Sequence, residues 1–511
     1  TGGTGVTLGD AMARTQAAGG AVTITATSGD VAQGTGRLTV VSNSDVTGTE
    51  MLTIAAQAGN IVLANSQLTG GSVAGRESDV VLTASGAITA DDLDGDRVAL
   101  SAAGDILADT IEAGTGAADL GDLAERQSID IVSTGGSVTL NTASALGAGH
   151  DIDVRASAGL TVNSLSAGGS LVGRAGNAIA IGTASAGEDV ALRSNTGTIT
   201  VTGATTAGDD VLLTAAGAIA TGSVTASGTG PDTRTVVFGA GALDAAYAAE
   251  SNAGGDIVAS STAASFTGNG AVSAASDVSV TTATSTALLS TTTASAGNVT
   301  VAAGTSAQLV GDVTSGIDTT ITAGTTAAIE QNVTAGGNYS VTGGTGVTLG
   351  DAMARTQAAN GTVTITAAAG DIAKGTGRLT VVSNADRTAA NNTESLTLTA
   401  AAGNIALTNS QLTGGSAPTG SGGRESDVRL TARGIVVGKV DGASLTARGV
   451  TGFATTEAIT AGNVTRAADP VSGASTVDIA VTGGTIGLAD VTATNTGHDI
   501  LLNASGAITA A

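Results

Sequence analysis

The sequence predicts an all-β fold, a β-solenoid whose coils of about 20 residues stack in parallel into an elongated rod. Three observations predict it. A short opening pattern recurs every 19–25 residues, the segments after it alternate in side-chain direction, and the composition suits a narrow core. Self-similarity at such a period marks units that cannot bury an apolar face alone and must stack on their neighbours. We therefore expect a single continuous solenoid over residues 1–511.

The opening pattern is a small polar residue followed by apolar residues at the next position and the third. We expect each opener to start a new coil, because Asp, Asn, Ser and Thr at a strand entry bond nearby backbone N–H groups and form a corner. The openers are Asp151, Ser170, Asp189, Asp210, Thr235, Asp256, Asp277, Asn298, Asp318, Asn338 and Thr362.

The segments after the openers have the pattern of strands. In Gly208–Gly222, for example, Val211, Leu213 and Ala215 lie on one side of an alternating run that Gly217 interrupts. Period-2 alternation with β-branched residues, bounded by Gly or Asn, indicates strands. No segment keeps the i, i+3, i+4, i+7 spacing of a helix. We expect two or three strands per coil.

The composition restricts which side chains can fill the core. The chain has 77 Gly, no Trp, no Cys, 2 Tyr and 3 Phe. Val, Ile, Leu and Ala must therefore fill the interior, as a narrow stacked core requires. We expect the glycines to supply positive-φ corners, a conformation that other residues enter only at a cost.

A longer duplication overlies the coils. Residues 1–163 recur as 342–511, with 164–341 as intervening coils, and the offset between the copies grows from 341 to 348. The added residues lie where loops leave the coils, and surface loops tolerate insertions that a stacked ladder does not. Both ends of the sequence fall within the coil pattern, so we expect a piece of a longer array.

Three kinds of segment interrupt the pattern and are expected to project as short helices or loops. Loops on a rigid scaffold are where binding usually resides. These segments are Asp10–Ala18 with its copy Asp351–Ala359, Ala117–Gln127 and Leu243–Glu250.

The global charge excludes some partners. The chain has 19 basic and 43 acidic residues, a net charge of −24. Such a surface repels nucleic acid and anionic lipid, and few aromatic residues are present to stack on bases. No run of 18 apolar residues appears, so we expect no membrane insertion. The absence of cysteine and the acidic, Gly/Thr/Ala/Ser-rich composition favour secretion.

Two sets of acidic residues are candidates for Ca²⁺, which prefers several oxygen ligands. Asp189 and Asp210 are openers of adjacent coils, about one strand spacing of 4.8 Å apart. Asp91, Asp92, Asp94 and Asp96 resemble part of a calcium loop with its central Gly but lack the distal Glu. In both sets a corner or a solvated acidic turn is the favoured interpretation, so no metal or other cofactor is assigned.

Catalysis has no candidate residue. The two histidines, His150 and His498, occupy equivalent positions in the long copies, without Cys or a second His nearby. One His cannot form a transition-metal site alone, and a turn role is favoured. The GxSxG motif of a hydrolase is absent. We expect no enzymatic activity.

Four short coil signatures recur along the chain. They are the AGNIVL of Ala58–Leu63, the SGAITA of Ser85–Ala90, the AGDILA of Ala103–Ala108 and the AAGNIAL of Ala401–Leu407. These signatures resemble the central repeat region of the filamentous haemagglutinin family, the large exoproteins of two-partner secretion. The resemblance implies a right-handed parallel β-helix, secreted or attached to the bacterial cell surface.

What the resemblance implies for function is a structural and adhesive shaft. Its partners would be cell-surface or matrix receptors, or further copies that join it into extracellular filaments. Two alternatives stay open. Polysaccharide lyases and hydrolases also use parallel β-helices, but they need clustered charges and aromatic residues. The other alternative is ice binding, which uses rows of Thr-x-Thr motifs. The sequence has TIT at Thr23–Thr25, Thr198–Thr200 and Thr364–Thr366, but TxT does not occur on every coil.

Overall fold

The protein is described from a computed structural model. The structure describes residues 1–9, 12–13, 20–34, 36, 38–41, 51–69, 79–113, 127–229, 234–241, 243–249, 254–350, 353–356, 361–374, 380–382, 395–413, 427–442, 444–461, 477–493 and 499–510.

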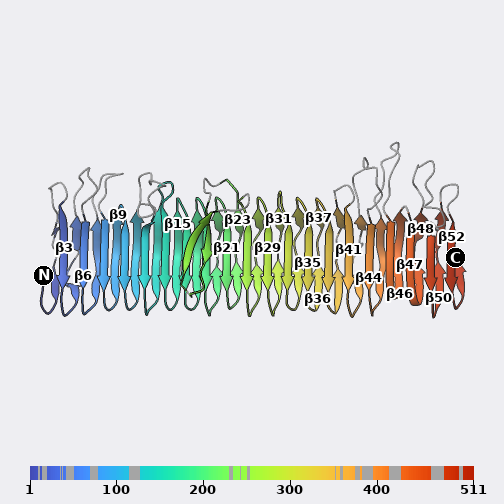
Figure 1. The fold of residues 1–511 in the computed structure, drawn as a ribbon, viewed down its shortest axis with the longest axis horizontal. Coiled ribbons are helices and arrows are strands. Elements are labelled where there is room, and N and C mark those ends of the chain that lie inside the picture. Colours follow the sequence, from blue (N-terminus) through green and yellow to red (C-terminus); the bar gives the residue numbers. More distant parts are fainter. Residues whose placement is uncertain are drawn as a thin grey trace. The chain divides into compact units, whose positions relative to one another are not determined.

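The described residues contain strands and turns but no helix. They form two compact units, Thr1–Thr262 (unit 1) and Ala263–Ala511 (unit 2). Within each unit, strands of successive coils pair in parallel (Figure 1). The predicted fold class, an all-β parallel solenoid, is confirmed. Long strands in some coils run from one side to the next, and elsewhere three short strands make a coil.

In unit 1 the pairings form three parallel ladders. Ladder A contains β3 (Ala21–Ala26), β6 (Met51–Ala56), β8 (Asp79–Ala84), β10 (Val98–Ala102), β12 (Gln127–Ser133), β14 (Asp151–Ala156), β16 (Leu171–Ala175), β18 (Val190–Ser194), β21 (Val211–Ala215) and β26 (Ile257–Ser261).

Ladder B of unit 1 contains β1 (Val6–Leu8), β4 (Val31–Gln33), β7 (Ile61–Thr69), β9 (Ile88–Gly95), β11 (Ile106–Ala113), β13 (Val138–Ala145), β15 (Leu160–Ala167), β17 (Ile179–Ala186), β19 (Ile199–Val201) and β22 (Ile219–Thr221). The long strands β7 to β17 also continue into ladder C, with β2 (Met12–Ala13), β5 (Leu38–Val41), β20 (Thr205–Ala207) and β23 (Val224–Ala226).

Unit 2 repeats this plan. Ladder A contains β29 (Val278–Thr282), β32 (Val299–Ala303), β35 (Thr319–Ala323), β38 (Tyr339–Gly343), β41 (Thr362–Ala367), β44 (Ser395–Ala400), β46 (Asp427–Gly442), β47 (Leu445–Thr455), β49 (Val477–Val481) and β52 (Ile500–Ala504).

Ladders B and C of unit 2 share the long strands β45 (Ile405–Thr413) and β46, and ladder B also includes part of β47. Ladder B adds β27 (Phe266–Gly268), β30 (Ala287–Leu289), β33 (Ala307–Leu309), β36 (Thr326–Ile329), β39 (Gly346–Leu349), β42 (Ile372–Lys374), β50 (Thr485–Leu488) and β53 (Ile508–Ala510). Ladder C contains β28 (Val272–Ala274), β31 (Thr292–Ala294), β34 (Val313–Ser315), β37 (Val333–Ala335), β40 (Met353–Thr356), β43 (Thr380–Val382), β48 (Ala458–Ala461) and β51 (Asp490–Ala493).

The core consists of aliphatic side chains stacked in register. On ladder A of unit 2, Val301 pairs with Ile321, Ile321 with Val341, and Val341 with Ile365, and all four are fully buried. Because alternate residues of a strand face opposite sides, the residues between them point outward. The predicted interior of small aliphatic groups is confirmed for the described coils.

Tyr339 is an exception in this core. Its ring is 0% exposed, and its hydroxyl has no hydrogen-bond partner among the described residues. Burial raises the pKa of Tyr339. We expect Tyr339→Phe to raise the free energy of unfolding by about 1–3 kcal/mol, because a buried hydroxyl without a partner carries its desolvation cost. Urea denaturation measures the difference, and a lower stability of the variant would contradict the prediction.

The coil corners are built by Asx side chains. In unit 2 the backbone N–H of Asn338 donates to Oδ1 of Asp318 at 2.6 Å, and the Asn338 amide donates to the same oxygen at 3.3 Å. An Asn above an Asp satisfies the carboxylate without placing two like charges together. The same two bonds join Asp30 to Asn60, Asp277 to Asn298, Asp312 to Asn332, and Asp371 to Asn404.

The glycines act differently from the expectation. Among the described residues only Gly5, Gly36, Gly149, Gly228 and Gly255 have positive φ. Most turn glycines instead lie against the backbone of the preceding coil. A Cβ on Gly324 would lie 2.1 Å from the carbonyl oxygen of Gly304, for example. The positive-φ explanation was therefore wrong for most turns, where close stacking of main chains excludes a side chain.

One excursion also differs from the expectation. Thr235 opens no coil, because it lies in β24 (Arg234–Phe238), which pairs antiparallel with β25 (Ala245–Ala249). The segment Leu243–Glu250 is thus largely a strand of this hairpin and not a helix or loop. In the other excursions the structure describes only Met12–Ala13 and Met353–Thr356, both strands, and Gln127, which begins β12. Their remaining residues lie outside the described ones.

Candidate functional site

Unit 1 carries a groove along its outer surface. It has a volume of about 670 Å³ and is lined by residues of ladder B from β7 to β19. Of these strands, β9, β11, β13, β15 and β17 each break their alternation once, with two consecutive outward residues between buried ones. These outward pairs are Asp91–Asp92, Asp109–Thr110, Asn141–Thr142, Asn163–Ser164 and Gly182–Thr183. The first residue of each pair lines the groove.

A row of Asx side chains lines the groove, one from each coil. Asp91, Asp109, Asn141 and Asn163 are the first members of their outward pairs, and the amide of Asn163 donates to Oδ1 of Asn141 at 3.5 Å. Successive members lie about one strand spacing of 4.8 Å apart. We call these four residues the Asx row. It is acidic at the β9 end and neutral beyond β11.

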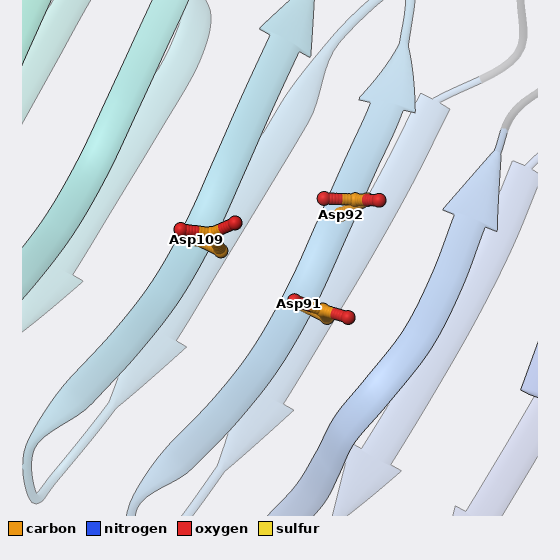
Figure 2. Close-up of side chains that lie close together, drawn as sticks. All are labelled: Asp91, Asp92 and Asp109. Carbon is orange, nitrogen blue, oxygen red and sulfur yellow. The ribbon is translucent and has the colours of Figure 1, made fainter. Parts of the chain in front are cut away.

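Three carboxylates meet at the acidic end. Oxygens of Asp91, Asp92 and Asp109 all lie within 4.8 Å of one another. Figure 2 shows Asp91 and Asp92 on β9 and Asp109 on the neighbouring β11. Thr110 pairs with Asp92, which places Asp109 beside Asp91. Asp109 is exposed and the other two are half-buried. Hard cations with oxygen ligands suit such a set, so these are the residues that could hold one.

The structure separates the other residues of the predicted acidic turn from this set. Asp91–Asp94 lie in β9 and not in a turn, so the turn interpretation was wrong. Asp94 is two residues beyond Asp92 along the strand, and Asp96 follows the strand end. Asp94 pairs in register with Glu112 of β11. Burial raises the pKa of Asp94, and the nearby charge of Glu112 raises that pKa further.

We expect Asp94→Asn to stabilise unit 1 at pH 7. A carboxyl group whose folded-state pKa is raised binds its proton more tightly in the folded protein. Its unfavourable contribution therefore develops as pH rises from the unfolded pKa through the raised folded pKa. The variant should unfold at higher urea concentration than wild type at pH 7 and match it more closely at pH 3. A variant with unchanged stability at pH 7 would contradict this.

Asp189 and Asp210, the second pair of predicted cation candidates, lie at coil corners. The backbone N–H of Asp210 donates to Oδ1 of Asp189 at 3.2 Å, and the N–H of Asp256 donates to Oδ1 of Asp210 at 2.8 Å. Each carboxylate thus accepts a bond from the next coil. Burial raises the pKa of Asp210, and the hydrogen bond from Asp256 partly offsets that effect.

The histidine that the structure describes is buried. His150 is 4% exposed, and its Nδ1 contacts the hydroxyl of Ser128, which is 1% exposed. The neighbouring Asp151 accepts the N–H of Ser170 at 2.7 Å. Ser128 and His150 therefore contact each other, Asp151 serves the neighbouring coil corner, and none of the three lines the groove. This contact fits a structural role. His498 lies outside the described residues.

Sequence reasoning missed most of the groove. It singled out Asp91 and Asp92 but neither Asp109 nor the two asparagines, because the opener pattern aligns coils on ladder A. An alignment on the buried residues of ladder B would have found the signal, since an Asx follows Ala90, Ala108, Leu140 and Val162.

These features define a class, the parallel β-solenoid repeat proteins. Comparison with protein-family models, curated protein sequences and solved structures finds no match. The structural evidence thus supports a solenoid-like repeat architecture, and the haemagglutinin-like identity suggested by the coil signatures stays a proposal. Among the described residues no helix is a candidate for a membrane span.

Proposed function

We propose that the chain is a structural and adhesive shaft of a secreted or surface-attached bacterial exoprotein. The observation that carries this proposal is the stacking within each unit. Backbone ladders and Asx corners join coil to coil, so the fold needs few specific side chains on its outside. A scaffold of this kind presents the same outward positions many times over. Many weak contacts acting together give strong attachment.

The adhesive role predicts retention of particles that carry the chain. Beads coated with the native protein should adhere to matrix-coated or cell-coated surfaces more than beads coated with the same protein after denaturation. Electron microscopy of the native assembly tests the filament part of the proposal. Equal retention of both bead types would overturn the adhesive role, and isolated short monomers would overturn filament formation.

A second function, ice binding, is favoured by one specific observation. On ladder A of unit 2, register brings outward residues into two rows that carry a hydroxyl at every position except Ala302, although TxT is not present on every coil. The first row is Ser279, Thr300, Thr320, Ser340, Thr364 and Thr397, and the second is Thr281, Ala302, Thr322, Thr342, Thr366, Thr399 and Thr431.

The geometry of these rows suits an ordered water lattice. None of their side chains is buried, and none forms a hydrogen bond within the described structure. Neighbours lie about 4.8 Å apart across coils, and the two rows lie about 6.6–6.8 Å apart along the strands. This net is similar in spacing to the oxygen positions on an ice surface.

Thermal hysteresis measures the second function directly. The wild-type protein should lower the freezing point below the melting point, and Thr342→Lys in the middle of the second row should reduce that gap by more than half. Thr314→Lys, at an exposed position on ladder C, is the matched control and should leave it unchanged. A wild-type protein without hysteresis would remove this candidate.

A further inference from the structure

The hairpin β24–β25 of unit 1 lies outside the parallel ladders. Its strands pair with each other, with Val237 opposite Ala246 and Phe238 opposite Ala245. No pairing joins them to a coil strand among the described residues. The hairpin is inserted between β23 and β26, and Figure 1 shows it lying across the strands of unit 1. Its attachment to the coils therefore depends on side chains.

Apolar residues form the first part of this attachment. Val236 of the hairpin is 4% exposed, and it packs with Phe238 and Ala245 against the coils. The coil side of the contact is an outward row of ladder A, in which Val172 pairs with Ala191 and Ala191 with Leu212. Val237, which alternates with the buried residues, is 45% exposed. One side of the hairpin thus faces the coils.

Arginines form the second part. Two residues further along the same strands, Arg155 pairs with Arg174 and Arg174 with Arg193. Arg174 donates to the carbonyl oxygen of Leu243 at 2.6 Å, and Arg193 donates to that of Gly239 at 2.7 Å.

Arg193 also lies over the ring of Phe238, 5.6 Å from its centroid. Gly239 and Leu243 flank the hairpin turn. The turn is therefore held by guanidinium groups, and the strands are held by the apolar row.

The outward residues beneath the hairpin differ from those on ladder A of unit 2 between β29 and β44. There the outward positions carry hydroxyl side chains such as Thr320 and Thr322, with Ala302 as an exception. The coils beneath the hairpin carry valine, alanine, leucine and arginine instead. Apolar residues on an outward sheet row indicate a covered surface. The sequence of these coils is thus fitted to the hairpin.

We propose that the hairpin β24–β25 is a releasable strap. It detaches from ladder A as one piece while the coils beneath it stay wound. Release uncovers the apolar row and the guanidinium groups of Arg174 and Arg193, so it changes the chemistry of this surface without unfolding the solenoid.

Two observations make the strap easier to open than a coil. Among the described residues its contacts are a small apolar cluster, two hydrogen bonds to turn carbonyls and the Arg193–Phe238 contact, whereas neighbouring coils share continuous backbone ladders. Docking also leaves Nε of Arg174 buried without a hydrogen-bond partner among the described residues. Elements with few buried contacts open locally before the global unfolding of a protein.

Thiol accessibility tests the strap, because the natural chain has no cysteine. Ala191→Cys places a single thiol beneath the strap, where the native side chain is 0% exposed. Ala215→Cys places one in the coil interior, where the native side chain is 1% exposed. Ala302→Cys serves as an uncovered reference on ladder A. The rate of reaction with a thiol reagent is measured for each variant under native conditions.

We expect the thiol at position 191 to react at least about tenfold faster than that at 215 and more slowly than that at 302. Adding Val236→Ser should raise the rate at 191 by about tenfold, because it weakens only the apolar docking. Val237→Ser is the matched control and should change the rate at neither 191 nor 215. Equal protection at 191 and 215 would overturn independent release. A rate at 191 equal to that at 302 would overturn docking.

Discussion

Replacing Asp153 by alanine is expected to lower the free energy of unfolding of unit 1 by about 3–5 kcal/mol. Arg174 contacts both carboxylate oxygens of Asp153, and the two side chains are 5% and 12% exposed. Removal of the carboxylate leaves a buried guanidinium without its counter-charge. The carboxylate of Asp130 does not replace it, because Arg155 already binds that carboxylate at 2.6 Å. Urea denaturation followed by circular dichroism measures the loss.

A surface pair provides the control for this prediction. Arg429 and Asp427 are 3.1 Å apart, with 56% and 35% of their side chains exposed. Asp427→Ala should cost only about 0–1 kcal/mol, because water screens the charges. The double variant Asp153→Ala/Arg174→Met should recover much of the loss, since no unpaired charge remains. Equal effects of Asp153→Ala and Asp427→Ala would show that burial of the Arg174 pair contributes nothing.

The second large effect is expected for Gly324→Ala in unit 2. The added Cβ would lie 2.1 Å from the carbonyl oxygen of Gly304 in the preceding coil. The obstacle is main chain, so it cannot rotate away as a side chain would, and the two coils must separate locally. We expect a loss of about 1–3 kcal/mol, toward the upper end of the range for overpacking. Urea denaturation again gives the value.

Gly452→Ala is the matched substitution for Gly324→Ala. A Cβ at Gly452 would lie 3.6 Å from the carbonyl oxygen of Thr485, an ordinary contact distance. This variant should be neutral or slightly stabilising, because alanine has less conformational freedom in the unfolded chain. If both variants lost the same stability, the glycine requirement would lie in the unfolded state and not in the coil-to-coil contact.

The fold could be predicted because its main determinants are local and repeated. Alternation such as that of Val211, Leu213 and Ala215 reports which residues face the core, and the period reports how often the pattern returns. Register then follows, since a slip of one residue would turn the buried row outward. The Asx openers marked the corners for the same reason, and Asp189 and Asp210 are examples that the structure describes.

The role of glycine could not be predicted from the local pattern. A glycine that turns the chain with positive φ and one that makes room for a neighbouring coil look alike in sequence. Gly149 belongs to the first kind and Gly324 to the second. Only the distance between coils distinguishes them, and that distance involves residues about one full coil apart.

The groove and the hairpin were missed because both depend on contacts between residues of different coils, but only the groove residues recur with the coil period. Asp91 and Asp109 are 18 positions apart, and the chain brings them together only because β9 and β11 pair in register. Arg174 and Leu243 are 69 positions apart. No period links Arg174 with Leu243, because the hairpin folds back onto coils that precede it. Contacts of this kind depend on the path of an insertion and leave no regular signal in the sequence.

The orientation of the backbone bonds has a mechanical consequence. The N–H to C=O bonds of the ladders run from coil to coil, so tension that draws coils apart loads them directly. Under such a pull a terminal coil would peel away while its neighbours held, releasing a short length of polypeptide at each step. In an optical trap, the length of either unit would then increase in small, nearly equal steps.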